Sequence, residues 1–241
     1  MKEFGEALKL IFGKIADFFD IFDLSFFVSG IASISSVALY LHLADMHITF
    51  IGASTLSIVI GALACYVFGL VSFASGRWLR MSLIPFLACK KRSNIYENFD
   101  AQFRGVLTAH GLNDEKPFSE YLDSSRQADR GIWRLYVRLW AEIRHSNTVT
   151  PSLQLLRRYW VMAATYDGIA ISMALWALLI LAGSFGWGIK SFVNWKVGVP
   201  LATVLILFGA ACLREASRFV SYQVEELVAS VAAARGSITK N

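Results

Sequence analysis

Four long stretches of the chain contain no Asp, Glu, Lys or Arg, and they restrict its possible folds more than any other feature. They cover residues 24–44, 46–76, 168–189 and 197–213, with lengths of 21, 31, 22 and 17 residues. A helix needs about 20 mainly apolar residues to cross the ~30 Å hydrocarbon core of a bilayer. The stretches therefore predict four membrane-spanning helices and exclude a soluble protein. The expected spans cover about 24–44, 49–75, 160–188 and 197–213.

The composition indicates the same class of protein. Hydrophobic residues make up 56% of the chain and charged residues 17%, whereas soluble domains have about 45–50% and about 25%. The mean hydropathy of +0.51 also excludes intrinsic disorder. The three cysteines, Cys65, Cys89 and Cys212, show neither a disulfide framework nor metal-ligand spacing. We therefore expect no metal and no cofactor.

The distribution of basic residues predicts the orientation of the spans. Residues 77–158 hold 14 of the 23 Lys and Arg residues, against eight acids. The loop 45–48 holds none, and the loop between the last two spans holds only Lys190 and Lys196. Basic residues near span ends stay on the cytoplasmic side. We therefore expect a multi-pass protein of the inner (plasma) membrane with a cytoplasmic central segment and cytoplasmic N- and C-termini.

Helical periodicity outside the spans completes an all-α architecture. Thr150 and Pro151 are typical of the start of a helix, which is expected to run on into the third span. The helical pattern of the fourth span continues from Glu215 to about Arg235, and Gly236 is the expected stop. We therefore predict two transmembrane hairpins whose helices extend into a cytoplasmic helical module. The expected segments are an amphipathic N-terminal helix over 1–23, a hairpin over 24–76, the module over 77–159, a second hairpin over 160–213, and a cytoplasmic C-terminal helix and tail over 214–241.

Small side chains recur every four residues in the second span, which places them on one helix face. Lipid tails give no hydrophobic drive between helices, so close backbone approach at small residues is a main source of association. The face therefore packs either within one subunit or against a second copy in a homo-oligomer. Its members are Ala53, Ser57, Gly61, Cys65 and Gly69, with shorter versions in the first span at Ser25, Ser29 and Ser33 and in the third span at Ala164, Gly168 and Ser172.

Asp167 lies at the cytoplasmic side of the third apolar segment. An ionisable group in a span is costly, and it usually faces a partner or a water-filled cavity. Arg214, which ends the fourth span on the same side, is the expected partner, with Arg77 behind it. The pattern allows a structural ion pair or a role in the passage of ions or protons.

A row of arginines at intervals of four marks the expected helix from Asp123 to about His145. The row consists of Arg126, Arg130, Arg134 and Arg138, and the basic run Lys90, Lys91 and Arg92 precedes it. Such a row is a solvated or lipid-facing strip, a docking surface for a cytosolic protein, or a site for a phosphate ligand. Asp129 and Glu142 interrupt it, and the net charge is only +5, which disfavours nucleic acid.

Sequence signatures of catalysis are absent. The chain has no His-Glu-x-x-His pair, no Walker loop and no Gly-x-Ser-x-Gly elbow. The four histidines, at positions 42, 47, 110 and 145, are scattered, and the adjacent carboxylates at 114–115 and 225–226 are typical of solvated faces. We therefore predict that the protein is not an enzyme.

The arrangement of four spans, cytoplasmic termini and a large segment between the second and third spans resembles that of stator proteins of the MotA type, relatives of ExbB and TolQ. Ile169–Gly183 is dominated by Ala, Leu, Ile and Trp, and Thr203 is the only threonine of the fourth span. These spans lack the Gly-rich and Thr-rich patterns of that family. The resemblance therefore implies a layout, and with it an ion-driven transporter or motor subunit as an alternative function.

These features predict a self-associating membrane protein. Its basic cytoplasmic module would dock a partner or sense a ligand, and its spans would form a pore or a membrane-perturbing assembly. A bacterial setting would favour an effector or sensor of a stress or phage-defence system. The alternatives are the ion-driven subunit and a structural membrane scaffold.

Overall fold

The computed structural model describes most of the chain. It covers residues 21–46, 55–87, 95–112, 114, 118–119, 129–145 and 150–238. Most of the predicted N-terminal helix lies outside the described residues, as do Ala53, Lys90, Lys91, Arg92 and Arg126.

Every regular element in the described part of the chain is an α-helix, which confirms the predicted all-α class. Four of these helices, α2, α3, α7 and α8, are long and apolar enough to cross a membrane. The helices are α2 (Ile21–Leu43), α3 (Thr55–Leu87), α4 (Ile95–Ala109), α6 (Asp129–His145), α7 (Thr150–Phe185) and α8 (Trp195–Ile238).

The last two helices are much longer than a bilayer is thick. α7 has 36 residues and α8 has 44, which at 1.5 Å per residue correspond to about 54 Å and about 66 Å. α7 begins at Thr150, as Thr150 and Pro151 predict. α8 continues without a break beyond its charge-free stretch and ends at Ile238, two residues after the expected stop at Gly236.

The chain packs as two compact units, and α3, α7 and α8 each contribute residues to both. The first unit comprises the chain up to Leu79 together with Ala164–Ala216, and the second comprises Arg80–Ala163 together with the chain from Ser217. All four charge-free stretches of the sequence fall within the first unit. The second unit therefore contains none of the charge-free stretches.

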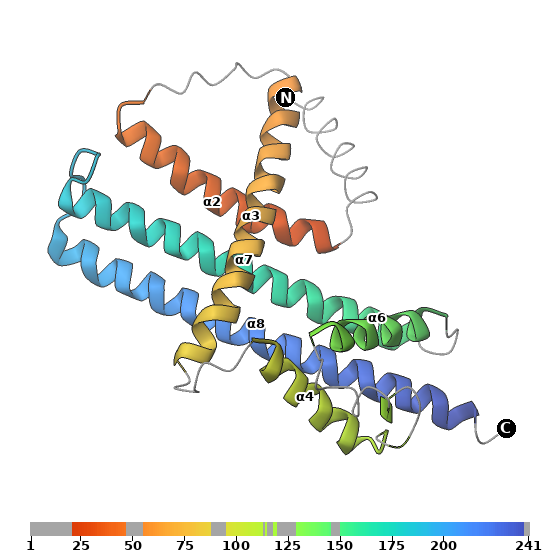
Figure 1. Ribbon diagram of the computed structural model, residues 1–241. Coiled ribbons are helices and arrows are strands. Elements are labelled where there is room, and N and C mark those ends of the chain that lie inside the picture. Colours follow the sequence, from red (N-terminus) through yellow and green to blue (C-terminus); the bar gives the residue numbers. More distant parts are fainter. Residues whose placement is uncertain are drawn as a thin grey trace. The chain divides into compact units, whose positions relative to one another are not determined.

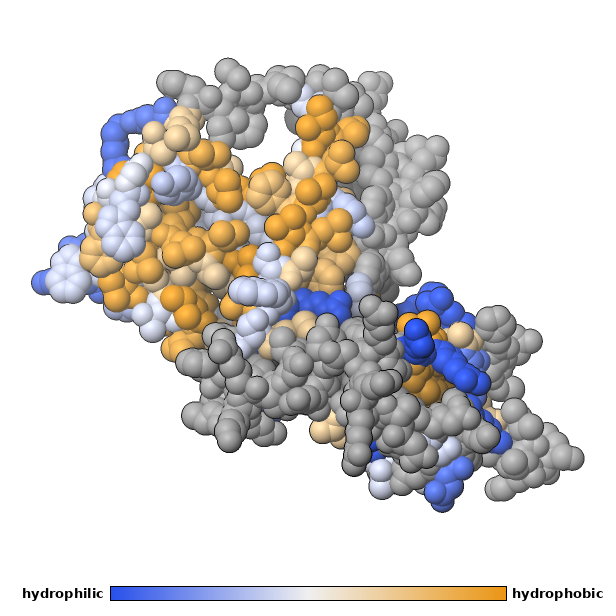
Figure 2. Space-filling model, in the orientation of Figure 1, coloured by the Kyte–Doolittle hydropathy of each residue, from blue (hydrophilic) through white to orange (hydrophobic). Residues whose placement is uncertain are grey.

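In the first unit, α7 is the central helix. Ala177 and Ile180 of α7 pack against Ala202 of α8, and Leu179 and neighbouring α7 residues pack against α2. Of the apolar windows in the four long helices, that of α7 is 44% buried and that of α3 only 11%. Figure 1 shows α8 alongside α7 and α3 crossing α2 and α7. Figure 2 shows apolar residues spread over the surface of these helices, which is the pattern expected of a lipid-facing surface.

The ends of α2 and α7 are closed by the same backbone motif. Asp45 follows α2 in the left-handed region, with φ of 55°, and the Met46 amide donates to the Leu41 carbonyl at 3.1 Å. Gly186 occupies the equivalent position after α7, also in the left-handed region, with φ of 69°. These are Schellman caps, which satisfy the last helix carbonyls without water.

The second unit has a hydrophobic core of its own. Its buried side chains come from α4, α6, the first turns of α7, the last half of α8 and the segment between α4 and α6, and they form one continuous cluster. The cluster includes Phe103, Leu107, Phe118, Leu135, Leu139, Ile143, Leu156, Val224, Leu227, Val228 and Val231.

Candidate functional site

Three serine hydroxyls from three different helices meet inside the first unit. Ser33 of α2 lies 2.8 Å from the Ser72 hydroxyl of α3 and 2.9 Å from the Ser172 hydroxyl of α7. Their exposed fractions are 0%, 3% and 0%. Inside a span no water satisfies such groups, so hydrogen bonds between helices do.

Counting protons gives these bonds a direction. The Ser172 hydroxyl lies 3.0 Å from the Ser29 carbonyl and 3.1 Å from the Gly168 carbonyl, so it donates to the backbone. Ser172 then accepts from Ser33, and Ser33 accepts from Ser72, because each hydroxyl has a single proton. The three helices are thus tied by one chain of hydrogen bonds that ends on a carbonyl.

Glycines allow the backbones to approach closely enough for these bonds. A Cβ at Gly69 of α3 would overlap the Phe26 carbonyl of α2, and a Cβ at Gly30 would overlap the Cys65 carbonyl. Gly76 lies in the same way against the Asp167 carbonyl of α7. The α2–α3 and α3–α7 crossings therefore both depend on a missing side chain.

Asp167 lies at this α3–α7 crossing, and its side chain is completely buried, with an exposed fraction of 0%. Arg77 is half-buried, whereas Arg214, the partner expected from the sequence, is exposed on α8. Among the described residues, Asp167 is the only Asp, Glu, Lys or Arg that is buried, and burial of a carboxyl in a span is costly.

The small-residue face of α3 divides into two parts. Gly69 is buried, and Ser57 and Cys65 are half-buried. Gly61 is exposed, and a Cβ there would meet no atom within 4 Å. The chain itself therefore occupies the face near Cys65 and Gly69 and leaves it open at Gly61.

The arginine row on α6 faces away from the core of the second unit. Arg134 and Arg138 are exposed, while Leu135 and Leu139 on the opposite side are buried. Arg130 belongs to α6, although its side chain is not among those described. The exposed side of α6 is therefore cationic along the part that the structure describes.

Glu142, which the sequence suggests would interrupt this row, is held by α8. Arg235 donates from Nε to Glu142 Oε1 at 2.8 Å and from Nη2 to Oε2 at 3.0 Å. The Arg235 guanidinium also lies 4.7 Å from the centre of the Phe118 ring. This two-bond pair neutralises the carboxylate and fastens α6 to α8.

The loop after α2 and the loop after α7 are joined by an exposed ion pair. Lys190 Nζ lies 2.9 Å from Asp45 Oδ2. The hydrogen bond and the charge of Lys190 lower the pKa of Asp45, and those of Asp45 raise the pKa of Lys190. The pair places these two loops at the same end of the first unit.

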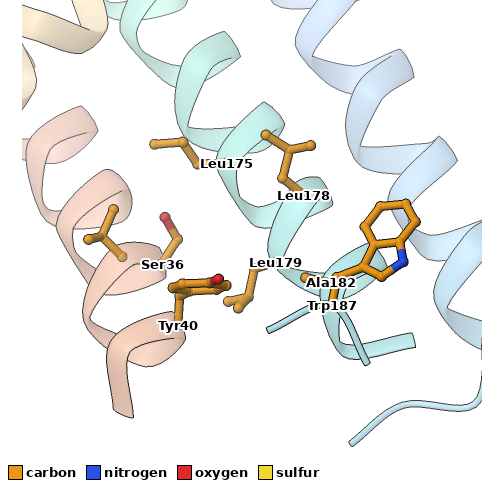
Figure 3. A pocket seen from close by; sticks show the side chains of 8 residues that line it. Ser36, Tyr40, Leu175, Leu178, Leu179, Ala182 and Trp187 are labelled. Atoms are coloured by element: carbon orange, nitrogen blue, oxygen red, sulfur yellow. The ribbon is translucent and has the colours of Figure 1, made fainter. Parts of the chain in front are cut away.

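A pocket of about 350 Å³ opens between α2 and α7 near that end. Figure 3 shows Ser36 and Tyr40 of α2 facing Leu175 and Leu179 of α7, and Trp187 of the loop after α7 also lines the pocket. Apart from Ser36 and the ring ends of the aromatic residues, its lining is aliphatic.

Within the described residues, no group of three His, Cys, Asp or Glu side chains could hold a metal ion. Cys65 and Cys212 are free thiols. Comparison of the chain with protein-family models, with curated proteins and with solved structures gives no match.

Proposed function

We propose that the chain is a non-enzymatic inner-membrane protein in which a cytoplasmic helical module docks a partner or ligand and transmits that event to four membrane spans. One observation carries this proposal: α7 and α8 each run unbroken through both compact units. A continuous helix is stiff along its axis, so a displacement at one end is transmitted to the other. The spans, self-associated, would then open or perturb the membrane.

The orientation is part of the proposal. The 14 basic residues between 77 and 158 favour a cytoplasmic second unit, by the positive-inside rule. The pair between Asp45 and Lys190 supports a shared outer side for the two loops, and with it two hairpins with cytoplasmic ends.

The docking surface would be the cationic side of α6. Arg134 and Arg138 are exposed there, and Glu142 is neutralised by Arg235. An acidic surface of a cytosolic protein complements this field, whose effect falls with salt. Reversal of both charges, Arg134→Glu with Arg138→Glu, should abolish co-purification of the partner. Reversal at Arg157 and Arg158, which are also exposed, is the matched control and should not.

Reconstitution of the full chain tests the membrane activity. We expect an assembly of several copies in detergent, measured by native mass spectrometry, and release of a trapped dye or ions from liposomes. A monomer that leaves liposomes tight would overturn the pore and indicate a structural scaffold.

A second candidate is ion or proton passage, as the MotA-like layout implies, and the complete burial of Asp167 favours it. An ionisable carboxyl inside a span is a typical element of ion and proton pathways. Under this proposal Asp167→Asn abolishes ion flux while the assembly keeps its mass. If the variant retains both flux and assembly, Asp167 has no role in passage.

A further inference from the structure

We infer that the pocket between α2 and α7 binds one acyl chain of a phospholipid from the leaflet next to the Asp45–Lys190 pair. This inference requires only that the four apolar helices lie in a membrane, and it holds whether or not the assembly conducts. It goes beyond general solvation by lipid, because it assigns a single chain to a defined site.

The pocket lies at the depth of acyl chains. α2 ends at Leu43, so Tyr40 and Ser36 lie about 5 Å and about 10 Å below the end of the helix. The pocket therefore begins just below the headgroup level and extends into the hydrocarbon region. In a membrane, lipid chains surround this part of the helices and can enter the pocket from the side.

The chemistry of the lining favours a hydrocarbon chain over a polar ligand. Leu179 and Ala182, with exposed fractions of 3% and 8%, form the inner wall, and Leu178, 61% exposed, stands at its edge. The Ser36 hydroxyl donates its single proton to the Ser33 carbonyl at 2.7 Å, so it offers no donor to a ligand. A ligand inside the pocket thus meets aliphatic carbon almost throughout.

The outer end of the pocket is polar, as an amphiphile requires. The Tyr40 hydroxyl lies next to Gly188, where a Cβ would come within 2.9 Å of it. Trp187 is 61% exposed at the same end. Tyr and Trp at such positions sit at the headgroup level of a bilayer. Since Lys190 is paired with Asp45, the site should select for the tail and not for an anionic headgroup.

Photo-crosslinking tests this assignment on the full-length protein in nanodiscs. The probe is phosphatidylcholine with a diazirine in one acyl chain, and adducts are mapped by peptide mass spectrometry. We expect adducts concentrated on residues 36–40 and 175–182, and equal displacement of the probe by unlabelled phosphatidylcholine and phosphatidylglycerol with the same tails.

Variants that fill the pocket provide a second test of acyl-chain binding. Val37→Trp and Leu175→Trp each place a large ring in the pocket and should lower labelling of its walls several-fold. Ala62→Trp, at an exposed position on α3 outside the pocket, is the matched control and should leave that labelling unchanged.

Three results would overturn the inference. Adducts spread evenly over α3 and the pocket walls would show that the probe contacts the protein only as part of the surrounding bilayer. Protein–protein cross-links at residues 36–40 in place of lipid adducts would show that a second copy covers the pocket. Stronger displacement by phosphatidylglycerol would show recognition of the headgroup instead of the tail.

Discussion

At the level of single residues, buried hydroxyls and glycines hold the first unit together. Ser33 bonds to two helices at once, and Gly30, Gly69 and Gly76 remove side chains where backbones meet. In lipid these two devices replace the hydrophobic effect as the source of helix association. For both the hydroxyls and the glycines, a substitution can be compared with a control substitution on the same helix.

Ser33→Ala should destabilise the first unit. The change removes the middle hydroxyl of the three-serine chain and leaves Ser72 without its Ser33 partner, which should cost about 0.6–2 kcal/mol. Ser35→Ala, at an exposed position of the same helix, should cost almost nothing. Thermal unfolding in detergent measures the difference, and equal melting temperatures for the two variants would contradict the account.

Gly69→Val and Gly61→Val should have opposite consequences. At Gly69 the new side chain overlaps the Phe26 backbone, and forcing α2 and α3 apart should cost about 1–3 kcal/mol. At Gly61 it meets open space, so the fold of the single chain should be unaffected. If copies of the chain associate through α3, Gly61→Val should instead lower the mass of the assembly. Native mass spectrometry and thermal unfolding, run on both variants, separate these effects.

The Asp45–Lys190 pair should contribute stability only within a pH window. Because the folded protein lowers the pKa of Asp45, its contribution is present above the ordinary value of 3.8 and is lost as the pH falls through the lowered pKa. Because Lys190 has a raised pKa, its contribution is present below 10.5 and is lost as the pH rises through that raised pKa. Asp45→Asn should therefore melt slightly below the wild type at pH 7 and together with it near pH 2. A difference that persisted in acid would exclude the pair as its cause.

At the level of helices, periodicity and charge predicted much of what the structure contains. The four charge-free stretches located α2, α3, α7 and α8, and Thr150 located the start of α7. The serines of α2 and Ser172 of α7 were visible in rows of small residues spaced by four, but the pairing between the rows was not. Ser72 and Ser172 meet the α2 serines only because of how three helices cross, and sequence spacing within one helix carries no information on crossing.

Charge pairing between helices could not be predicted either, because it also depends on how the helices pack. Glu142 looked like a break in the arginine row, because its partner, Arg235, is 93 residues away. Arg214 was the expected partner of Asp167, and the structure places Asp167 fully buried on α7 and Arg214 exposed on α8. Position along a span predicts depth, but the direction of a side chain around its helix depends on packing.

The contact between α6 and α8 should be necessary for a stable second unit. Glu142→Gln removes the charge from a half-buried pair with two hydrogen bonds and should destabilise this unit by about 1–2 kcal/mol. Glu225→Gln, at an exposed position on α8, should not. Limited proteolysis of the full-length protein measures the effect, since loosening of α6 exposes new cleavage sites near it. Identical digestion of the two variants would contradict the proposed role of the pair.

At the level of the whole molecule, the two units differ in their surfaces and in what they bury. The first has apolar surface, buried hydroxyls and its charged pair at one end, whereas the second has a closed apolar core and an exposed arginine face. α7 and α8 belong to both. We propose that the four apolar helices span a membrane, with the loops that hold Asp45 and Lys190 on its outer side and residues 77–158 in the cytoplasm.

Sided labelling of single cysteines tests this claim most directly. In a chain whose three native cysteines are replaced by serine, single cysteines are introduced at four exposed positions: Asp45, Lys190, Arg138 and Glu225. Intact cells are treated with a membrane-impermeant maleimide. We predict labelling of the cysteines at 45 and 190 in intact cells, and of those at 138 and 225 only after permeabilisation. Labelling of 138 or 225 in intact cells, or opposite results for 45 and 190, would contradict the account.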